Sequence, residues 1–220
     1  MSECAINSTE ILEQASRPQA FGSHRFVLHA FSGRRRPGDF QEFLDAVTCA
    51  HEGVVIHVVS VDVILDAHWG DVTRDDCQQF WIGGVRQRYV VGYLAGPPCE
   101  TWSQARGATL TKEQQDLSGH EPRVLRTLDE IWGKSSLAVH EVRQVLVGNQ
   151  LLLFSFRMLL MLYVSGGCGA LEHPAPPRKE DLASIWRTPL AILLCSLPGV
   201  SRVDFSQGLL GAKSPQQHQF

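Results

Sequence analysis

The amino-acid sequence predicts an α/β fold, a doubly wound and mainly parallel Rossmann-like sheet with helices on both faces. Short, continuous apolar runs of strand length alternate along the chain with longer segments of helical periodicity. Strands that are covered on both faces, as in parallel sheets, are apolar throughout rather than in alternation. The run at 89–95 (YVVGYLA) then enters Gly96, Pro97 and Pro98, where the chain must leave the sheet because proline has no N–H. This order is typical of a sheet built from βαβ units.

The first half of the chain predicts three strands separated by helices. Residues 25–31 (RFVLHAF) form the first expected strand, and a loop with three arginines follows it. A helix is expected from about Asp39, a residue type that caps helix N-termini. The apolar residues behind it recur at helical spacing, namely Phe40, Phe43, Leu44 and Val47. The run 54–61 (VVIHVVSV) predicts the second strand, residues 74–83 a helix, and 89–95 the third strand.

The second half predicts two further strands and two long helices. Residues 104–147 are charged and broken by glycine and proline, which is typical of loops with short helices. The apolar segment 151–164 predicts a buried helix that two glycines end, and 168–171 a short strand. An amphipathic helix is expected over 180–197, and a last strand over 200–205.

Length and composition favour one soluble domain. The chain has 220 residues, of which 44% are hydrophobic and 20% charged. These values are ordinary for a globular domain, which we expect over 25–210, between a polar N-terminal arm at 1–24 and a polar tail at 211–220. The N-terminus lacks a basic region followed by an apolar one, and the apolar run 151–164 is too short to cross a membrane. The chain is therefore expected to be intracellular, with no membrane partner.

The cysteines indicate one reactive position and no metal site. Six cysteines lie far apart and none forms a C-x-x-C pair, so neither a zinc site nor a secreted disulfide framework is expected. Cys99 is distinctive because it follows two prolines at the carboxyl end of a predicted strand, where open α/β sheets bind their ligands. A thiol in that place is well positioned to be a nucleophile. The alternative is that it packs, as buried free cysteines commonly do.

Several strand ends carry residues that a parallel sheet would bring to one edge. The first strand ends in Phe31, Ser32 and Gly33, the second in Asp62, the third in Pro97, Pro98 and Cys99, and the short strand 168–171 in Glu172. Asp71 adds a second carboxylate in a Gly-Asp-Val sequence. In this order and spacing, over about 26–215, the chain resembles the catalytic half of the DNA cytosine-5 methyltransferases.

The resemblance implies a role for each of these residues. Cys99 would be the nucleophile that adds to C6 of cytosine, and Glu172 would hold the N3 edge of the base. S-adenosylmethionine, the methyl donor of the family, would lie along the ends of the first two strands. Its contacts would come from Phe31, Ser32, Gly33, Asp62, Asp71 and Pro97. DNA would be the methyl acceptor, with Ser103 in a loop that meets the base, and the nucleus is one compartment where such an enzyme works.

The chain departs from the family pattern in three places. The family has a second glycine close after the first strand, where this chain has Arg34, Arg35 and Arg36. His173 stands where the family has an asparagine after the glutamate. No target-recognition region is recognisable after the last predicted strand. The sequence is therefore expected to be a truncated fragment, a degenerate relative, or half of a two-chain enzyme in which a second chain supplies target recognition.

Two other hypotheses stay open. Three arginines suit an anion better than a sulfonium cation, so the domain is alternatively a non-catalytic module that binds phosphate or nucleic acid through this loop. The net charge of −3 gives no general basic field, and such binding would depend on the loop itself. The other alternative is a cysteine hydrolase, in which His173 or His140 would have to reach the Cys99 thiol.

Overall fold

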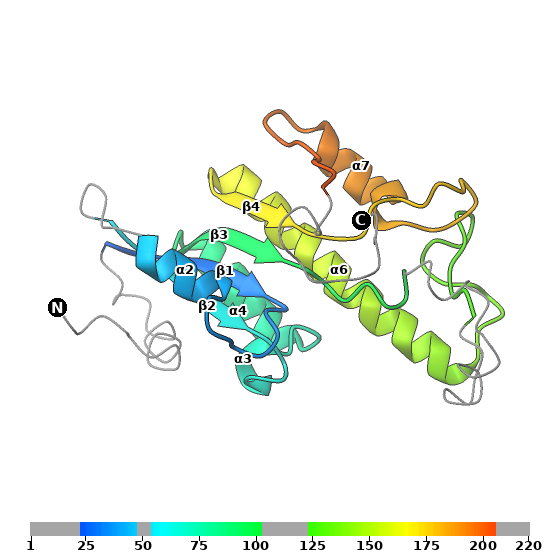
Figure 1. Ribbon diagram of the computed structural model, residues 1–220, viewed down its shortest axis with the longest axis horizontal. Helices are drawn as coiled ribbons and strands as arrows, with labels where there is room; N and C mark the ends of the chain where they lie inside the picture. The colour runs from blue at the N-terminus through cyan, green and yellow to red at the C-terminus, as the bar shows by residue number, and fades with distance from the viewer. Residues whose placement is uncertain (1–22, 48–53, 103–122, 206–220) are drawn as a thin grey trace. The chain divides into compact units, whose positions relative to one another are not determined.

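The computed structural model describes residues 23–47, 54–102 and 123–205. Within these ranges four strands make one sheet: β1 (His24–Ala30), β2 (Val55–Val61), β3 (Val90–Ala95) and β4 (Cys168–Leu171). Their order is β2-β1-β3-β4, and every neighbouring pair is parallel (Figure 1). The α/β, Rossmann-like fold predicted from the sequence is confirmed.

The helices of the first half connect these parallel strands. Helix α2 (Phe40–Val47) joins β1 to β2, while α3 (Ala67–Gly70) and α4 (Asp75–Arg86) join β2 to β3. The connection from β1 leads to β2, at one edge of the sheet. The connection from β2 passes β1 and leads to β3, on the opposite side of β1. Because crossovers between parallel strands are right-handed, the helices of these two connections cover opposite faces of the sheet. Helix α2 packs against β2, and α4 packs against β3 (Figure 1).

The core of the sheet is made by the apolar runs seen in the sequence. Leu28 of β1 and Ala95 of β3 are fully buried, as are Ile82 and Val85 of α4. Burial of each large aliphatic side chain stabilises the fold by about 1.5–3 kcal/mol. A Cβ atom on Gly84 would lie 2.8 Å from the Val90 side chain, so the glycine allows α4 to approach β3 closely.

The chain groups into two compact units. The first comprises Met1–Pro97 and Arg157–Glu172, and the second Pro98–Phe156 and His173–Phe220. The second unit contains the short helices η2 (Ile185–Arg187) and α7 (Pro189–Ser196). Helix α6 (Val139–Ser165) contributes its residues up to 156 to the second unit and the remainder to the first. One domain over 25–210 stays a prediction.

Three predicted elements of the second half differ from the structure. Helix α6 begins at Val139 rather than at 151, within a stretch whose composition predicts loops with short helices. The helix predicted over 180–197 is confirmed only over α7 and is wrong before it. Pro189, which lacks an N–H, starts α7, and the Thr188 hydroxyl caps that helix by accepting the Ala191 N–H at 3.3 Å. The strand predicted over 200–205 is also wrong: this segment is irregular, and Val203 is 73% exposed.

Helix α6 is, among the described residues, the one helix long and apolar enough to cross a membrane by length and composition. A single helix of this kind is weak evidence for a membrane span, because the core helix of a soluble protein passes the same test. Its most apolar window is 44% buried inside the protein, which is compatible with a soluble chain.

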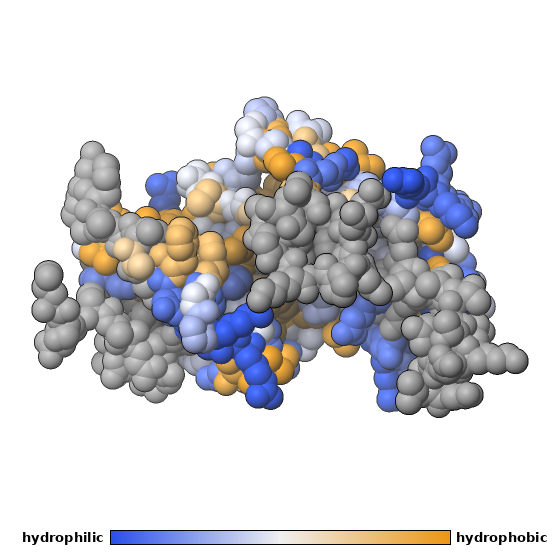
Figure 2. Space-filling model, viewed as in Figure 1, coloured by the Kyte–Doolittle hydropathy of each residue, from blue (hydrophilic) through white to orange (hydrophobic). Residues whose placement is uncertain are grey.

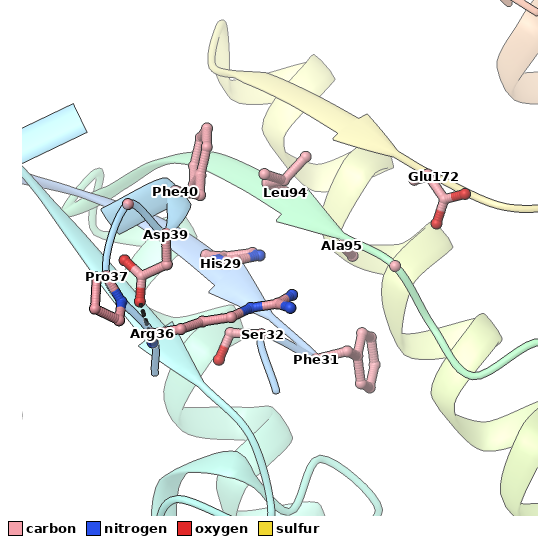
Figure 3. A pocket seen from close by; sticks show the side chains of 12 residues that line it. His29, Phe31, Ser32, Arg36, Pro37, Asp39, Phe40, Leu94, Ala95 and Glu172 are labelled. Atoms are coloured by element: carbon pink, nitrogen blue, oxygen red, sulfur yellow. Dashed lines mark hydrogen bonds between the residues drawn. The ribbon is translucent and has the colours of Figure 1, made fainter. Parts of the chain in front are cut away.

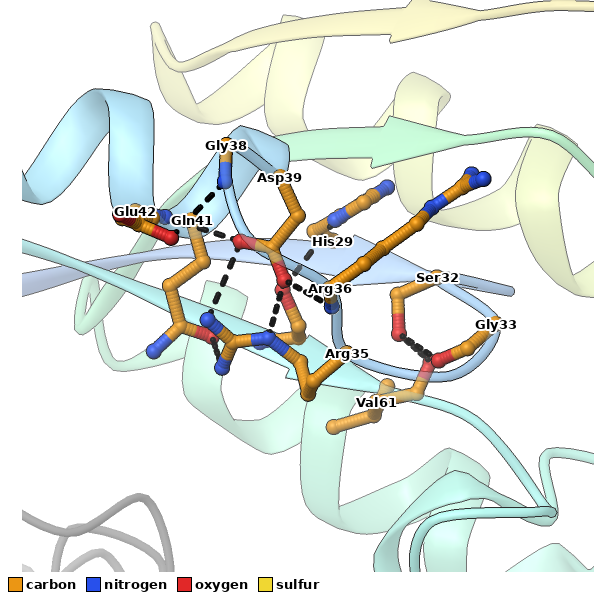
Figure 4. A network of polar contacts seen from close by, with 11 residues as sticks. His29, Ser32, Gly33, Arg35, Arg36, Gly38, Asp39, Gln41, Glu42 and Val61 are labelled. Atoms are coloured by element: carbon orange, nitrogen blue, oxygen red, sulfur yellow. Dashed lines mark hydrogen bonds and ion pairs between the residues drawn. The ribbon is translucent and has the colours of Figure 1, made fainter.

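The N-terminus of α2 is fixed by a polar network (Figure 4). Asp39 caps the helix by accepting the Glu42 N–H at 3.0 Å, as the sequence predicts, and Glu42 accepts the Gly38 N–H at 2.9 Å. The Arg35 guanidinium pairs with the Asp39 carboxylate and donates to the Gln41 carboxamide oxygen at 2.8 Å. That oxygen also accepts the N–H of Ser60 at 3.1 Å, which ties the helix to β2.

The outer face of α2 is more apolar than a solvated helix requires. Phe43, one of the apolar residues at helical spacing, is 59% exposed. Apolar surface is visible over α2 in Figure 2. Phe40 instead lies toward the sheet, with its ring edge-on to His29 at a centroid distance of 5.2 Å.

We expect Asp39→Ala to lower the free energy of unfolding by about 1 kcal/mol at pH 6, the usual effect of losing an N-cap. The hydrogen-bonded Arg35 guanidinium lowers the pKa of Asp39 to about 2 from its ordinary value of 3.8. A carboxyl whose pKa is depressed by folding stabilises above its unfolded pKa and loses that effect as the pH falls through the folded one. The difference between wild type and variant should therefore shrink between pH 4 and pH 2 in urea titrations.

Asp204→Ala is the matched control, because this carboxylate makes an exposed pair with Arg202 two residues away. Such pairs contribute little to stability, so the control should match the wild type at every pH. A difference between Asp39→Ala and wild type that stays constant down to pH 2 would contradict the prediction.

Candidate functional site

A pocket lies at the carboxyl edge of the sheet, between the ends of β1 and β3. The chain leaves β1 toward β2 on one side and β3 toward β4 on the other, which makes this point the topological switch point of the sheet. Open α/β sheets bind their ligands there. The pocket has a volume of about 530 Å³, within the range of small-molecule sites (Figure 3). Its lining consists of His29, Phe31, Ser32, residues 36–40, Leu94, Ala95, Gly96 and Glu172.

Glu172 is held at the rim of the pocket by its backbone. Its N–H donates to the Ala95 carbonyl oxygen at 2.8 Å, which continues the pairing of β4 with β3 past the last strand residue. The side chain is half-buried, and burial raises the pKa of the Glu172 carboxyl above its ordinary value. A Cβ atom on Gly96 would lie 3.3 Å from Glu172 Oε2, so the glycine leaves room for this carboxyl. The group is therefore suited to hold a proton and donate it in a hydrogen bond.

Phe31 directs its ring into the pocket from a strained backbone (Figure 3). Its φ is 59°, and among the described residues Arg88 is the one other non-glycine residue with positive φ. A bulky side chain rarely adopts this conformation, which costs on the order of 1–3 kcal/mol and is found mainly at functional sites. The turn is fixed by the Ser32 N–H, which donates to the Val61 carbonyl oxygen at 3.2 Å.

The three arginines after β1 do not act as one group. Arg35 is engaged in the cap of α2 and does not line the pocket. Arg36 does line it, and Figure 3 shows this side chain extending from its loop toward the ends of β1 and β3. Arg34 is exposed. The predicted anion-binding loop is thus reduced, within the pocket, to Arg36.

His29 is a pocket residue that the sequence did not reveal. Its Nδ1 lies 3.2 Å from the Ser60 hydroxyl, and burial lowers the pKa of the imidazole, with the Asp39 charge opposing this effect in part. His29 is therefore a neutral polar group in the pocket wall. The sequence hides it because it stands inside an apolar strand run, where a histidine is commonly a core residue.

The expected cofactor residues form a second cluster, at the ends of β1 and β2. Asp62 accepts the Gly33 N–H at 2.9 Å through Oδ2 and the Ile64 N–H at 3.0 Å through Oδ1. A Cβ atom on Gly33 would meet nothing within 4 Å, so open space adjoins this backbone. Each Asp62 oxygen retains capacity for a further hydrogen bond. Asp62 and Gly33 thus lie together, outside the lining of the pocket.

Other predicted cofactor residues have local roles. Asp71 accepts the N–H of Thr73 at 3.1 Å and its hydroxyl at 2.6 Å, the pattern of a turn residue. A Cβ on the preceding Gly70 would stand 2.3 Å from the backbone of Asp62, so the two backbones are in direct contact. Pro97 is buried. Ser103 lies outside the described residues.

In the second unit, Cys99 stands at the start of a tight turn. Its thiol is partly buried and not in a disulfide, and its carbonyl oxygen accepts the Trp102 N–H at 2.8 Å. Arg126 stabilises this turn with two hydrogen bonds. Its Nε donates to the Thr101 carbonyl oxygen at 3.1 Å and its Nη2 to the Thr101 hydroxyl at 2.9 Å. The guanidinium also lies 3.8 Å from the centre of the Trp102 ring, a cation–π contact.

Arg126 is a buried cation whose hydrogen-bond partners are all neutral. It is 1% exposed, and its remaining N–H groups reach the carbonyl oxygens of Ile131 and Val145 and the Asn149 side chain, at 3.0, 3.3 and 2.7 Å. Burial lowers the pKa of Arg126 to about 10, so it stays charged at neutral pH. Gly148 of α6 makes room for Thr101, because a Cβ there would lie 2.8 Å from Thr101 Oγ1.

His173, which stands where the cytosine-5 methyltransferases have an asparagine, is a buried neutral group of the second unit. It is 8% exposed, its Nδ1 has no hydrogen-bond partner among the described residues, and burial lowers its pKa to about 4. Its ring lies edge-on to Trp102 at a centroid distance of 6.4 Å. His140, the other histidine of the hydrolase hypothesis, is exposed.

Comparison of the chain with protein-family models, with curated proteins and with solved structures gave no match. In the part of the chain that the structure describes, no group of three or more histidine, cysteine, aspartate or glutamate side chains could hold a metal ion. The function must therefore be argued from the residues themselves. The structure gathers Phe31, Ser32, Arg36 and Glu172 around one pocket and Gly33 with Asp62 beside it, whereas Cys99 belongs to the other unit.

Proposed function

We propose that this chain is a methyltransferase of the cytosine-5 type, which transfers a methyl group from S-adenosylmethionine to C5 of cytosine in DNA. The observation that carries the proposal is the Glu172 carboxyl, which follows β4 into the switch-point pocket. Burial raises its pKa, and it makes no ion pair with a described residue. Such a carboxyl suits the N3 edge of cytosine.

The chemistry assigns complementary tasks to Glu172 and Cys99. A protonated Glu172 would donate to N3 of the base, and its carbonyl oxygen would accept from the exocyclic amine. This hydrogen bond favours the charge that develops when a nucleophile adds to C6. The Cys99 thiolate would make that addition, which turns C5 into an enamine carbon that accepts a methyl group. The target base would have to leave its stack to reach these groups.

The residues at the ends of β1 and β2 fit S-adenosylmethionine. The open space beside Gly33 admits a ligand next to the backbone, and the unused acceptor sites of Asp62 suit the hydroxyls of a ribose. Val63 and Ile64, which follow Asp62, are 54% and 57% exposed and offer apolar surface to a planar base. The cofactor would supply an electrophilic methyl group. The pairing of Arg35 with Asp39 neutralises one of the three cations in the arginine loop and so lessens its charge conflict with a sulfonium.

A second candidate function is favoured by Arg36. Its guanidinium lines the pocket, and guanidinium groups bind phosphate in a bidentate manner. A non-catalytic module that holds a phosphate or nucleic acid through the loop 34–36 would use the same pocket without a cofactor.

Calorimetric titration with S-adenosylmethionine separates these two functions. We expect saturable binding to the wild-type chain and a loss of about tenfold or more in affinity for Asp62→Ala, because hydrogen bonds to a charged group contribute roughly 1.5–3 kcal/mol. Asp75→Ala, which removes an exposed carboxylate from the first turn of α4, is the matched control and should bind like wild type. Absence of binding in a folded chain would refute methyl transfer and leave the anion-binding module.

A further inference from the structure

An arginine and a carboxyl group line the pocket without pairing with each other. Arg36 comes from the loop after β1, and Glu172 from the end of β4 (Figure 3). Among the described residues, neither side chain makes an ion pair. A polar side chain that lines a cavity without such a partner is available to a ligand.

The lining of the pocket between these groups is mixed, with apolar side chains beside the polar His29, Ser32 and Asp39. Phe31 and Leu94 contribute large side chains to the lining. Ala95 and Gly96, at the end of β3, have small side chains or none and leave space for a ligand. The volume of about 530 Å³ is sufficient for one nucleotide and modest for a longer ligand. The Phe31 ring and the small residues at the end of β3 favour a flat, uncharged ligand group between Arg36 and Glu172.

The positions of Arg36 and Glu172 also specify the orientation of a ligand in the pocket. Arg35 is neutralised by Asp39, so Arg36 is the cation that faces the pocket from this loop. A guanidinium attracts an anion and repels ammonium and sulfonium groups. Burial favours the neutral form of Glu172, which pairs with an edge that both accepts and donates hydrogen bonds.

We propose that the pocket binds one cytidine nucleotide, with its phosphate on the Arg36 guanidinium and the N3 and amino edge of its base on Glu172. This assignment rests on the proposed function, since it takes cytosine as the substrate. It adds a phosphate-binding residue in the loop where the family has a glycine. Arg36 is then a binding residue for the substrate backbone, and the loop 34–36 is no obstacle to methyl transfer.

A phosphate with this environment has two sources, a free nucleotide and a nucleic-acid strand. Single-stranded DNA is the suitable form of the second, because no base pair has to be opened first. Binding of deoxycytidine, deoxycytidine 5′-monophosphate and a single-stranded pentanucleotide with one central cytosine would be measured by calorimetry on the full chain. The variants are Arg36→Gln and, as a control with the same change in net charge, Arg86→Gln in the exposed last turn of α4.

We expect the monophosphate to bind wild type roughly tenfold or more tightly than the nucleoside, since a charge-assisted hydrogen bond is about twice as strong as a neutral one. In Arg36→Gln this ratio should fall to about one, while Arg86→Gln keeps it. A pentanucleotide that binds more tightly than the monophosphate, with an affinity that falls with salt, identifies nucleic acid as the source. Equal binding of both identifies a free nucleotide.

Several results would overturn the assignment. These are equal affinities of wild type for nucleoside and monophosphate, an unchanged ratio in a folded Arg36→Gln protein, and no binding of any cytidine ligand. The assignment and the proposed function fail separately. Binding of S-adenosylmethionine without a phosphate effect refutes the role of Arg36 alone, whereas a phosphate effect without S-adenosylmethionine binding refutes methyl transfer alone.

Discussion

Replacement of Arg126 by methionine is expected to lower the free energy of unfolding by about 3–5 kcal/mol, because several buried acceptors lose their donors at a cost of about 1–3 kcal/mol each. Methionine fills a similar volume but donates no hydrogen bond. Both Thr101 oxygens, the Asn149 side chain and two carbonyl oxygens would lose their donors in a buried place. The loss of the cation–π contact with Trp102 adds to this effect. A change of this size is a large fraction of the stability of a typical domain.

Urea unfolding followed by near-ultraviolet circular dichroism measures this effect. Arg143→Met is the control, since Arg143 is exposed on α6 and its replacement should change stability by less than about 0.5 kcal/mol. Arg126→Lys should fall between the two, because an ammonium has three donors where the guanidinium has five. A stability of Arg126→Met within 1 kcal/mol of wild type would mean that water or a rearranged turn replaces the guanidinium.

Cys99→Ser is expected to abolish covalent capture of a single-stranded oligonucleotide that contains 5-fluorocytosine, in the presence of S-adenosylmethionine. After addition at C6 and methyl transfer, cytosine normally loses its C5 proton as the thiol is eliminated. With fluorine at C5 there is no proton to remove, so the thiol adduct persists. A serine hydroxyl is a far weaker nucleophile than a thiolate at neutral pH. The adduct, detected by denaturing electrophoresis and mass spectrometry, should be formed by wild type and be absent from the variant.

Cys195→Ser is the control for this experiment, because Cys195 is exposed on α7 and should play no part in capture. Cys99→Ser should also keep the unfolding midpoint of wild type. Unfolding of Cys99→Ser would identify the thiol as a packing group. Capture by a folded Cys99→Ser protein would assign the nucleophile to another residue.

The sheet was predictable because its strands depend on local sequence. The runs at β1, β2 and β3 are mostly apolar, and the short β4 lies between two glycines and Glu172, so their limits agree with the structure to within about one residue. The predictions for the later elements were wrong where the local sequence pattern did not decide the structure. Pro189 divides an apparently continuous amphipathic segment, and the segment 200–205 finds no strand partner within the described residues.

The site was predictable only in part, for a similar reason. That Phe31, Ser32 and Glu172 gather at one edge follows from strand order, which the apolar runs indicate. Arg35 pairs with Asp39 and Gln41, whereas Arg36 lines the pocket. Which of the two arginines pairs depends on the geometry of the helix N-terminus, which the sequence does not show. The burial of Arg126 depends on contacts with Thr101, before it in the chain, and Asn149, after it. The composition of the sequence does not predict such contacts.

The register of the sheet has a consequence for folding. β1 pairs with β2 from His24 to Val55, whereas β3 pairs with β4 from Gly92 to Cys168, a much longer closure of the chain. The entropy lost in closing a loop grows with its length, and contacts distant in sequence form slowly. A ribosome also releases β1, β2 and β3 well before β4. Glu172 therefore joins the sheet late, and a nascent chain holds three parallel strands with an open edge on β3 before its pocket exists.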